Sequence, residues 1–166
     1  FSTLFYIKPQ DKVIIFMENR PELLYSFLGT WDKRGTCVCL DASFSGEELV
    51  YYLNDSDAKF IYTSNGSQKA VVEGLALSGK TSEVKVINVD EIEVEDIEIK
   101  EYILKAPEKE DIALMLYTSG TTGNPKGVML KFDNILVNIE GLDKYKMFIS
   151  EDIVLALLPM HHNFPL

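Results

Sequence analysis

The chain of 166 residues contains only two cysteines and two histidines, which limits the disulfide and metal chemistry open to it. Cys37 and Cys39 stand two positions apart in an apolar run, a spacing that puts both thiols on one face of a strand. Cys-x-Cys is not a usual zinc spacing, and the sequence has no further cysteine that could complete such a site. We therefore expect buried, reduced thiols of the kind found in cytoplasmic proteins.

Basic residues are also scarce, because 16 lysines and arginines face 26 aspartates and glutamates and leave a net charge of −10. Nucleic-acid binders need a basic face, so this balance argues against a general nucleic-acid binder. Apolar stretches reach only about six residues, too short to span a bilayer. The sequence opens at Phe1 with neither a secretory leader pattern nor an initiator methionine. We expect a cytoplasmic piece of a longer polypeptide, and peripheral contact with a membrane stays open.

Apolar runs and amphipathic runs alternate along the chain. Runs rich in apolar residues predict six strands, at residues 13–17, 36–40, 59–63, 84–89, 111–117 and 152–157, and the first of these runs is apolar throughout. Apolar residues at helical spacing predict helices at residues 23–31, 45–53, 67–77 and 135–142. Strands separated by a dozen or more residues usually run parallel. The alternation therefore predicts one α/β domain over residues 1–166, built on an open, mainly parallel sheet with helices on both faces.

Local signals mark where some of these helices begin and end. Asn19 is expected to cap the first helix, with Pro21 in its first turn. Ser45 and Glu48 have the spacing of a capping box and should open the second helix. A turn is expected at residues 54–57, where asparagine, aspartates and serine follow one another.

Residues 90–110 interrupt the alternation with a dense run of carboxylates. Apolar β-branched residues alternate with these acids, a pattern compatible with an exposed edge strand or a mobile loop. Runs of like charge are usually solvated, so we interpret the segment as a solvated connection rather than a metal site.

Residues 117–128, Tyr-Thr-Ser-Gly-Thr-Thr-Gly-Asn-Pro-Lys-Gly-Val, carry the strongest functional signal. Their glycines can adopt backbone angles closed to other residues, so that successive N–H groups can converge on one anion. The hydroxyl groups add donors, Lys126 adds a positive charge, and Pro125 stiffens the turn before it. The stretch follows an apolar run, which favours a polyphosphate-binding loop over a plain exposed turn. The candidate phosphate-binding residues are Thr118, Ser119, Gly120, Thr121, Thr122, Gly123 and Lys126.

The spacing of this loop differs from that of the common nucleotide-binding loops. Five residues after Gly120 stands Pro125 instead of the second glycine of G-x-x-x-x-G-K-[ST], and G-x-G-x-x-G is absent. Ligands of open parallel sheets bind at the carboxyl ends of the strands. The loop on one side, and His161 and His162 on the other, each follow a predicted strand. We therefore expect both features on the same edge of the sheet.

The loop resembles the phosphate loop of the adenylate-forming superfamily, which includes acyl-CoA synthetases, peptide-synthetase adenylation domains and luciferases. That loop reads roughly [YF]-[ST]-[ST]-G-[ST]-[ST]-G-x-P-K-G, and every position of residues 117–127 fits it. Softer matches follow in the family's order, at residues 11–35, 40–42, 47–49, 55–59 and 152–162. The resemblance implies that the chain is the N-terminal αβ part of such an enzyme, about its first third.

The resemblance implies a two-step reaction for the parent enzyme. A carboxylate attacks the α-phosphorus of ATP to give an acyl-adenylate and pyrophosphate, and a thiol of CoA or a carrier protein then displaces AMP. Lys126 would act with the loop donors to stabilise the charge that grows on the departing pyrophosphate. Thr118 would contact Mg²⁺ through its hydroxyl, unless that hydroxyl only stitches the loop together. His162 would line the acyl pocket, unless it and His161 are ordinary histidines packed at a strand end.

Other parts of the family's machinery are expected beyond residue 166, so the piece alone should be inactive. These parts are an acidic residue for magnesium, an aspartate for the ribose and a lysine of a small C-terminal domain. Lys131 and Phe132 stand where members usually carry Ser/Thr-His. The pair His161 and His162 points to a fatty acid as substrate. An amino-acid adenylation domain and a non-catalytic nucleotide-binding module remain open alternatives.

Overall fold

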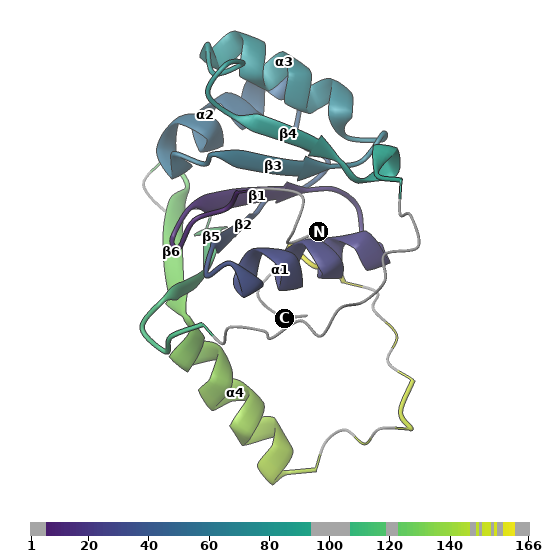
Figure 1. Ribbon diagram of the computed structural model, residues 1–166, viewed down its shortest axis with the longest axis vertical. Coiled ribbons are helices and arrows are strands. Elements are labelled where there is room, and N and C mark those ends of the chain that lie inside the picture. The colour runs from purple at the N-terminus through teal and green to yellow at the C-terminus, as the bar shows by residue number, and fades with distance from the viewer. Residues whose placement is uncertain are drawn as a thin grey trace.

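Five of the predicted strands form one sheet in the computed structural model, which describes residues 6–93, 107–118, 123–146, 149, 151–153, 155 and 158–161. The parallel strands are β1 (Lys12–Phe16), β2 (Thr36–Cys39), β3 (Phe60–Thr63), β4 (Lys85–Asn88) and β5 (Ile112–Thr118). A sixth strand, β6 (Lys126–Lys131), pairs antiparallel with β5. Within the described residues the strand order is β4-β3-β1-β2-β5-β6 (Figure 1).

Helices cover both faces of this sheet. One face packs against α1 (Pro21–Asp32) and the start of α4 (Phe132–Lys144), and its core includes both thiols, of Cys37 and Cys39. The other face packs against α2 (Gly46–Ser56) and α3 (Gln68–Ser78). A short 3-10 helix, η1 (Val89–Glu91), follows β4. The mainly parallel α/β fold is therefore confirmed, and so is the burial of the thiols, which are free.

The order in which the chain adds strands across the sheet changes direction at β1 and β2, which are parallel neighbours. From β1 the chain passes through α1 on one face to β2, and from β2 it returns through α2 on the other face to β3. Neighbouring strands whose connections leave to opposite faces open a crevice at their carboxyl ends, where open α/β sheets bind ligands. The candidate site of this chain is therefore expected beside the ends of β1, β2 and β5.

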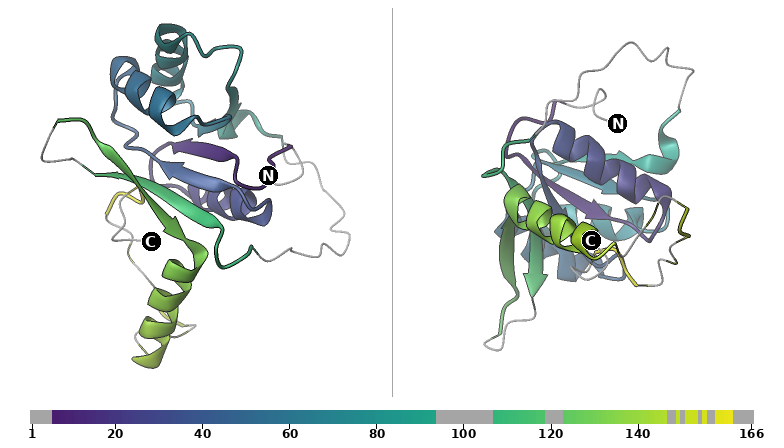
Figure 2. Two further views of the ribbon diagram at one scale, coloured as in Figure 1. Left: turned by 90° about the vertical axis from the view of Figure 1, so that its left-hand side faces the viewer. Right: turned by 90° about the horizontal axis from the view of Figure 1, so that it is seen from below.

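Strand β6 was not predicted from the sequence. Four of its six residues are exposed and two are half-buried, unlike the mostly buried residues of the central strands. The strand exists because it pairs with β5 across a hairpin, with Thr118 opposite Lys126 and Ile112 opposite Lys131. Figure 2 shows β5 and β6 as a long hairpin at the border of the sheet.

The predicted strand at residues 152–157 is wrong for the part that the structure describes. Asp152, Ile153 and Leu155 lie outside any strand, and Ile153 is 99% exposed. Strand β6 occupies the place beside β5, and the described residues of this run pair with no strand of the sheet. An apolar run by itself does not tell whether a partner strand is in reach.

Two local predictions need correction, and one is confirmed. Asn19 does not cap α1: the N-cap is Arg20, which makes no side-chain capping bond, although Pro21 does stand in the first turn. The turn predicted at residues 54–57 is mostly helix, because α2 continues to Ser56 before Asp57 adopts a left-handed conformation. Ser45 forms the expected capping box with Glu48.

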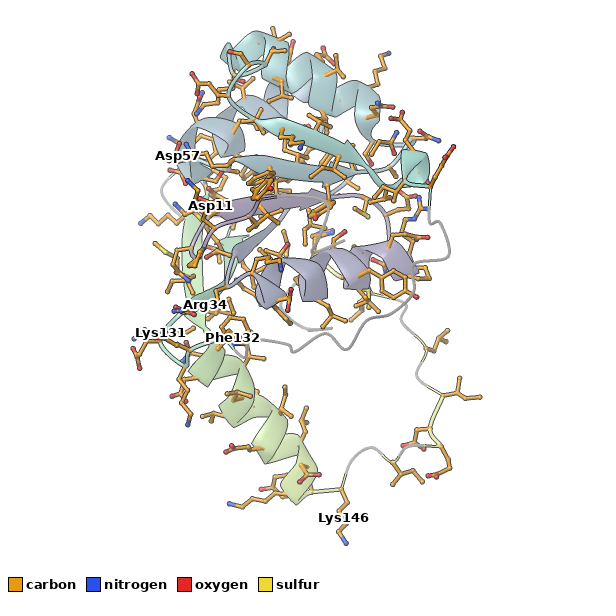
Figure 3. All side chains as sticks on the ribbon, in the orientation of Figure 1. Asp11, Arg34, Asp57, Lys131, Phe132 and Lys146 are labelled. Atoms are coloured by element: carbon orange, nitrogen blue, oxygen red, sulfur yellow. The ribbon has the colours of Figure 1, made fainter. Side chains whose placement is uncertain are left out.

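Helix α4 meets the rest of the molecule mainly through its first turn. Phe132 is buried against Trp31, with ring centroids 5.4 Å apart. Figure 3 shows Lys131 and Phe132 where α4 joins the sheet, with Arg34 nearby. The predicted helix at residues 135–142 is confirmed, but three of its apolar residues, Leu136, Ile139 and Leu142, are exposed.

Candidate functional site

The candidate phosphate loop lies at the tip of the β5–β6 hairpin. Thr118 ends β5 and Lys126 begins β6, and the two residues are partners in the ladder. Gly123 has a φ of 120°, a conformation that side chains with a Cβ rarely adopt. Four of the candidate residues, Ser119, Gly120, Thr121 and Thr122, lie outside the described residues. The loop thus joins two antiparallel strands, and β6 separates it from the helix that follows.

The two candidate side chains at the base of the loop have different surroundings. Lys126 is exposed, and no carboxylate of the described residues lies within ion-pair distance of it, so its ammonium group is available for an anion. The Thr118 hydroxyl donates a long hydrogen bond of 3.5 Å to the Lys126 carbonyl. That bond favours the structural role for Thr118, in which its hydroxyl links the two strands at the base of the loop. The bond is long and Thr118 is exposed, so the hydroxyl is still accessible to a ligand.

A cavity of about 490 Å³ opens beside the base of the loop, at the carboxyl ends of β2 and β5. Thr118, Pro125 and His161 line it together with Asp41 and Phe44. A second cavity of about 470 Å³ lies at the carboxyl ends of β1 and β2, and Asp41 and His161 line both cavities. The expectation that the loop and His161 share one edge of the sheet is therefore confirmed. His162 lies outside the described residues.

His161 reaches this edge because Asn19 holds the segment before it. The Asn19 Nδ2 group donates to the Leu158 carbonyl at 2.8 Å, and the Met160 N–H donates to Asn19 Oδ1 at 2.8 Å. His161 Nε2 is then 3.7 Å from an oxygen of Asp41, which follows β2. Asn19, which was predicted as a helix cap, thus acts as a clamp: it binds Leu158, which lies 139 positions further along the chain, and Met160, which lies 141 positions further along.

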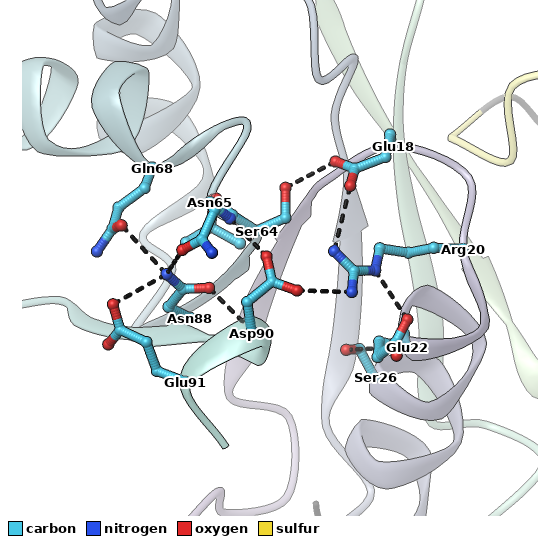
Figure 4. Close-up of polar contacts among 11 residues, drawn as sticks. Glu18, Arg20, Glu22, Ser26, Ser64, Asn65, Gln68, Asn88, Asp90 and Glu91 are labelled. Carbon is cyan, nitrogen blue, oxygen red and sulfur yellow. Dashed lines mark hydrogen bonds and ion pairs between the residues drawn. The ribbon is translucent and has the colours of Figure 1, made fainter. Parts of the chain in front are cut away.

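An ion-pair network joins the loops that follow β1, β3 and β4 (Figure 4). Arg20 contacts Glu18 at 3.2 Å, Glu22 at 2.7 Å and Asp90 at 2.6 Å. Asp90 also accepts a hydrogen bond from the Asn65 N–H, and Arg20 holds the pKa of this carboxyl below its ordinary value. The first carboxylate of the acidic run is therefore structural.

Most of the acidic run, residues 94–106, lies outside the described residues. Across the part of the chain that the structure describes, no cluster of three metal-ligating side chains occurs, and the interpretation of the run as a connection stays a prediction. In the same residues no helix is long and apolar enough to cross a membrane.

Two residues of α2 that sequence reasoning did not assign to the site contact the loop. The Tyr51 hydroxyl donates to the Pro125 carbonyl at 2.6 Å, and the Tyr117 hydroxyl donates to Asp55 Oδ2 at 2.6 Å. No local pattern could have found these contacts, because they join residues 74 and 62 positions apart.

The sheet, the hairpin and the edge cavity define an α/β protein with a candidate anion-binding loop. Residues 5–166 match the family of AMP-binding enzymes, and the chain belongs to this family. An oxalate–CoA ligase of Arabidopsis thaliana is 30% identical over 165 residues, which cover 94% of this chain and 32% of that protein.

Solved structures of related proteins have the same fold. The o-succinylbenzoate CoA synthetase of Bacillus subtilis in complex with AMP aligns with a TM-score of 0.72 and 29% identity, over 94% of this chain and 39% of the other. A long-chain-fatty-acid–CoA ligase of Archaeoglobus fulgidus aligns with a TM-score of 0.79 and 26% identity, over 95% and 32%. The chain therefore spans roughly a third of the length of these relatives.

Proposed function

We propose that this chain is one αβ domain, residues 1–166, of a longer acid–thiol ligase that activates a carboxylic acid with ATP and transfers it to CoA or a carrier-protein thiol. The observation that carries the proposal is the hairpin itself. Its sequence fits the family's phosphate loop at every position, its lysine is exposed and unpaired among the described residues, and its base lines a cavity at the carboxyl edge of the sheet. Membership of the AMP-binding enzyme family supports the same reaction class.

Lys126 and the donors of residues 118–123 would bind the triphosphate and stabilise charge on the departing pyrophosphate. Donors that are in place before the reaction need no reorganisation while the charge develops. Deprotonation of the acid precedes the step, so the chain's own residues need only hold and orient the phosphates.

The reaction class implies magnesium, and the described residues offer one candidate ligand for it. Mg²⁺ bound with a nucleotide takes most of its ligands from phosphate oxygens and water, with one or two from the protein. Thr118 offers one exposed hydroxyl at the right edge, while the described residues supply no carboxylate cluster. When bound, the ion would neutralise charge on the β- and γ-phosphates; Thr118 would supply one oxygen.

The acid that we propose is a fatty acid, with His162 lining the acyl pocket. The support is the His161–His162 pair and the apolar lining of the cavity by side chains such as Leu116, Val128 and Leu130. Related proteins are named for oxalate, o-succinylbenzoate and long-chain fatty acids, so the family alone does not select the acid. The free thiols in β2 agree with a reducing, cytoplasmic setting.

The test is ATP–pyrophosphate exchange by the full-length protein with a panel of fatty acids, short dicarboxylic acids and amino acids. Lys126→Ala should lower the exchange rate by about a hundred- to a thousandfold, in line with the loss of a preorganised donor, while KM for the acid changes little. Lys126→Arg should retain part of the rate because it keeps the charge. Lys144→Ala, at the exposed end of α4, is the matched control.

Exchange that Lys126→Ala leaves unchanged would refute the role of the loop. Exchange that depends on amino acids alone would identify an adenylation domain of the peptide-synthetase kind. A wild-type protein that binds ATP but supports no exchange with any acid would be a non-catalytic nucleotide-binding module.

A further inference from the structure

Helix α2 makes two side-chain hydrogen bonds to the phosphate-loop hairpin, one to β5 and one to the residue directly before β6. Tyr51 donates to the carbonyl of Pro125, directly before β6, and Asp55 accepts from the hydroxyl of Tyr117, in β5. Both bonds are 2.6 Å long. Tyr51 and Asp55 are four positions apart and therefore share one face of the helix. A single helix thus holds both sides of the hairpin immediately before and after the loop.

The bond from Tyr51 restrains the residue that we assign to the phosphate. The proline ring fixes φ of Pro125, so ψ is the soft dihedral left at that position. The Pro125 carbonyl and the Lys126 N–H belong to one planar peptide. A hydrogen bond that fixes the carbonyl therefore also fixes the direction of the Lys126 N–H and the start of its side chain.

Aromatic packing holds the two donors in place. The Tyr117 ring lies edge-on to Tyr52, with centroids 4.8 Å apart, and to Tyr51 at 6.4 Å. Tyr52 in turn stacks on Phe44 at 5.1 Å. Burial and the Asp55 carboxylate together raise the pKa of Tyr117, so its hydroxyl keeps the proton that it donates. The contacts leave both phenols few alternative rotamers.

The helix that carries these groups is itself firmly packed. Leu49 and Leu53 are buried in the core between α2, α3 and the sheet. Gly74 of α3 brings the two helices so close that an added Cβ would lie 3.0 Å from the Gly46 carbonyl oxygen. Helix α2 therefore provides a rigid support that the exposed hairpin does not have on its own.

We propose that Tyr51 and Asp55 are positioning residues, which hold the phosphate loop in its binding geometry by anchoring β6 and β5 to α2. This inference rests on the proposed function as far as catalysis is concerned. The anchoring itself is a statement about the loop and is measurable without any substrate. Each anchor is one hydrogen bond, so its loss should lower kcat for exchange about three- to tenfold, far less than the loss of Lys126.

The experiment compares four variants of the full-length protein with two controls. Tyr51→Phe and Asp55→Ala each remove one anchor, while Asp55→Asn keeps an acceptor for the Tyr117 hydroxyl and should rescue. The controls are Asp143→Ala, in the last turn of α4, and Tyr145→Phe, directly after this helix. Both residues are exposed. The fourth variant combines Tyr51→Phe with Asp55→Ala and shows whether the anchors act on the same loop.

Amide hydrogen exchange over residues 123–128 is the first measurement, and kcat and KM for ATP–pyrophosphate exchange are the second. We expect Tyr51→Phe and Asp55→Ala to speed amide exchange in this segment and to lower kcat with little change in KM for the acid. The controls and Asp55→Asn should stay near the wild type. Amide exchange that is unchanged in the double variant overturns the anchoring. If the wild type shows no nucleotide turnover, the proposed function fails, and the amide measurement still decides the anchoring.

Discussion

Gly74→Ala tests the packing that holds α2, and with it the support of the loop. Gly74 lies inside α3, and an added Cβ would lie 3.0 Å from the Gly46 carbonyl oxygen and 3.0 Å from the Leu49 Cβ. Neither neighbour can swing aside, because one is backbone and the other is attached directly to the backbone of a buried residue. The two helices must separate by a few tenths of an ångström to accept the methyl group.

Two opposing effects decide the sign of the change in stability. Alanine in place of glycine inside a helix gains about 0.8–1.0 kcal/mol from helix propensity. Overpacking of a close contact costs about 1–3 kcal/mol. We therefore expect Gly74→Ala to destabilise the α2–α3 pair by about 1 kcal/mol. Gly141→Ala in α4 is the matched control, since no atom lies within 4 Å of its added Cβ, and it should stabilise by about 0.5–1 kcal/mol.

Native-state hydrogen exchange of the full-length protein measures both changes locally. A loss of 1 kcal/mol corresponds to amides in α2 and α3 that exchange about fivefold faster. The Gly141→Ala variant should instead slow exchange in α4. If Gly74→Ala also slows exchange in its own helix, the two helices are packed less closely than the structure indicates, and the view of α2 as a rigid support is refuted.

Two further predictions concern the clamp at Asn19 and the ion pair between Arg34 and Asp111. Asn19→Ala removes two hydrogen bonds, each worth about 0.5–1.5 kcal/mol, and should speed hydrogen exchange of the Met160 amide. Asn19→Asp keeps the acceptor for that amide and should have a smaller effect. An unchanged exchange rate of the Met160 amide in Asn19→Ala would contradict the clamp. Arg34 donates to both oxygens of Asp111, at 2.7 and 3.0 Å, and lowers the pKa of this carboxyl in the folded state. The pair therefore stabilises the fold fully above the ordinary pKa of about 3.9. This stabilisation is lost as the pH falls through the lower pKa of the folded state. Thermal midpoints measured from pH 6 to pH 2 should therefore fall less steeply in Asp111→Asn than in the wild type, and parallel curves would exclude the pair as a cause of acid sensitivity.

Much of the fold was readable from local pattern because the buried elements have local signatures. The strands at the centre of the sheet are buried on both faces and rich in apolar residues, and five of the predicted apolar-rich runs became β1 to β5. The capping box of Ser45 and Glu48 spans three positions, so it is also visible in the sequence.

The wrong predictions share a different cause. Strand β6 depends on pairing with β5, and its apolar run is only three residues long, Val128 to Leu130. Within the apolar run at residues 152–157, the described residues Asp152, Ile153 and Leu155 belong to no strand, so composition alone was misleading there. Asn19 was assigned to the nearest helix, although its partners Leu158 and Met160 are far along the chain.

The chemistry of the loop was determined by the sequence alone, since glycines, hydroxyl groups, a proline and Lys126 lie within residues 117–128 and need no distant partner to be recognised. What surrounds the loop was decided only by tertiary structure. Tyr51 and Asp55 reach the hairpin across 74 and 62 positions, and His161 reaches the same edge through Asn19. Hydrogen bonds form between groups that are close in space, and no window along a chain contains that information before the sheet and α2 bring them together.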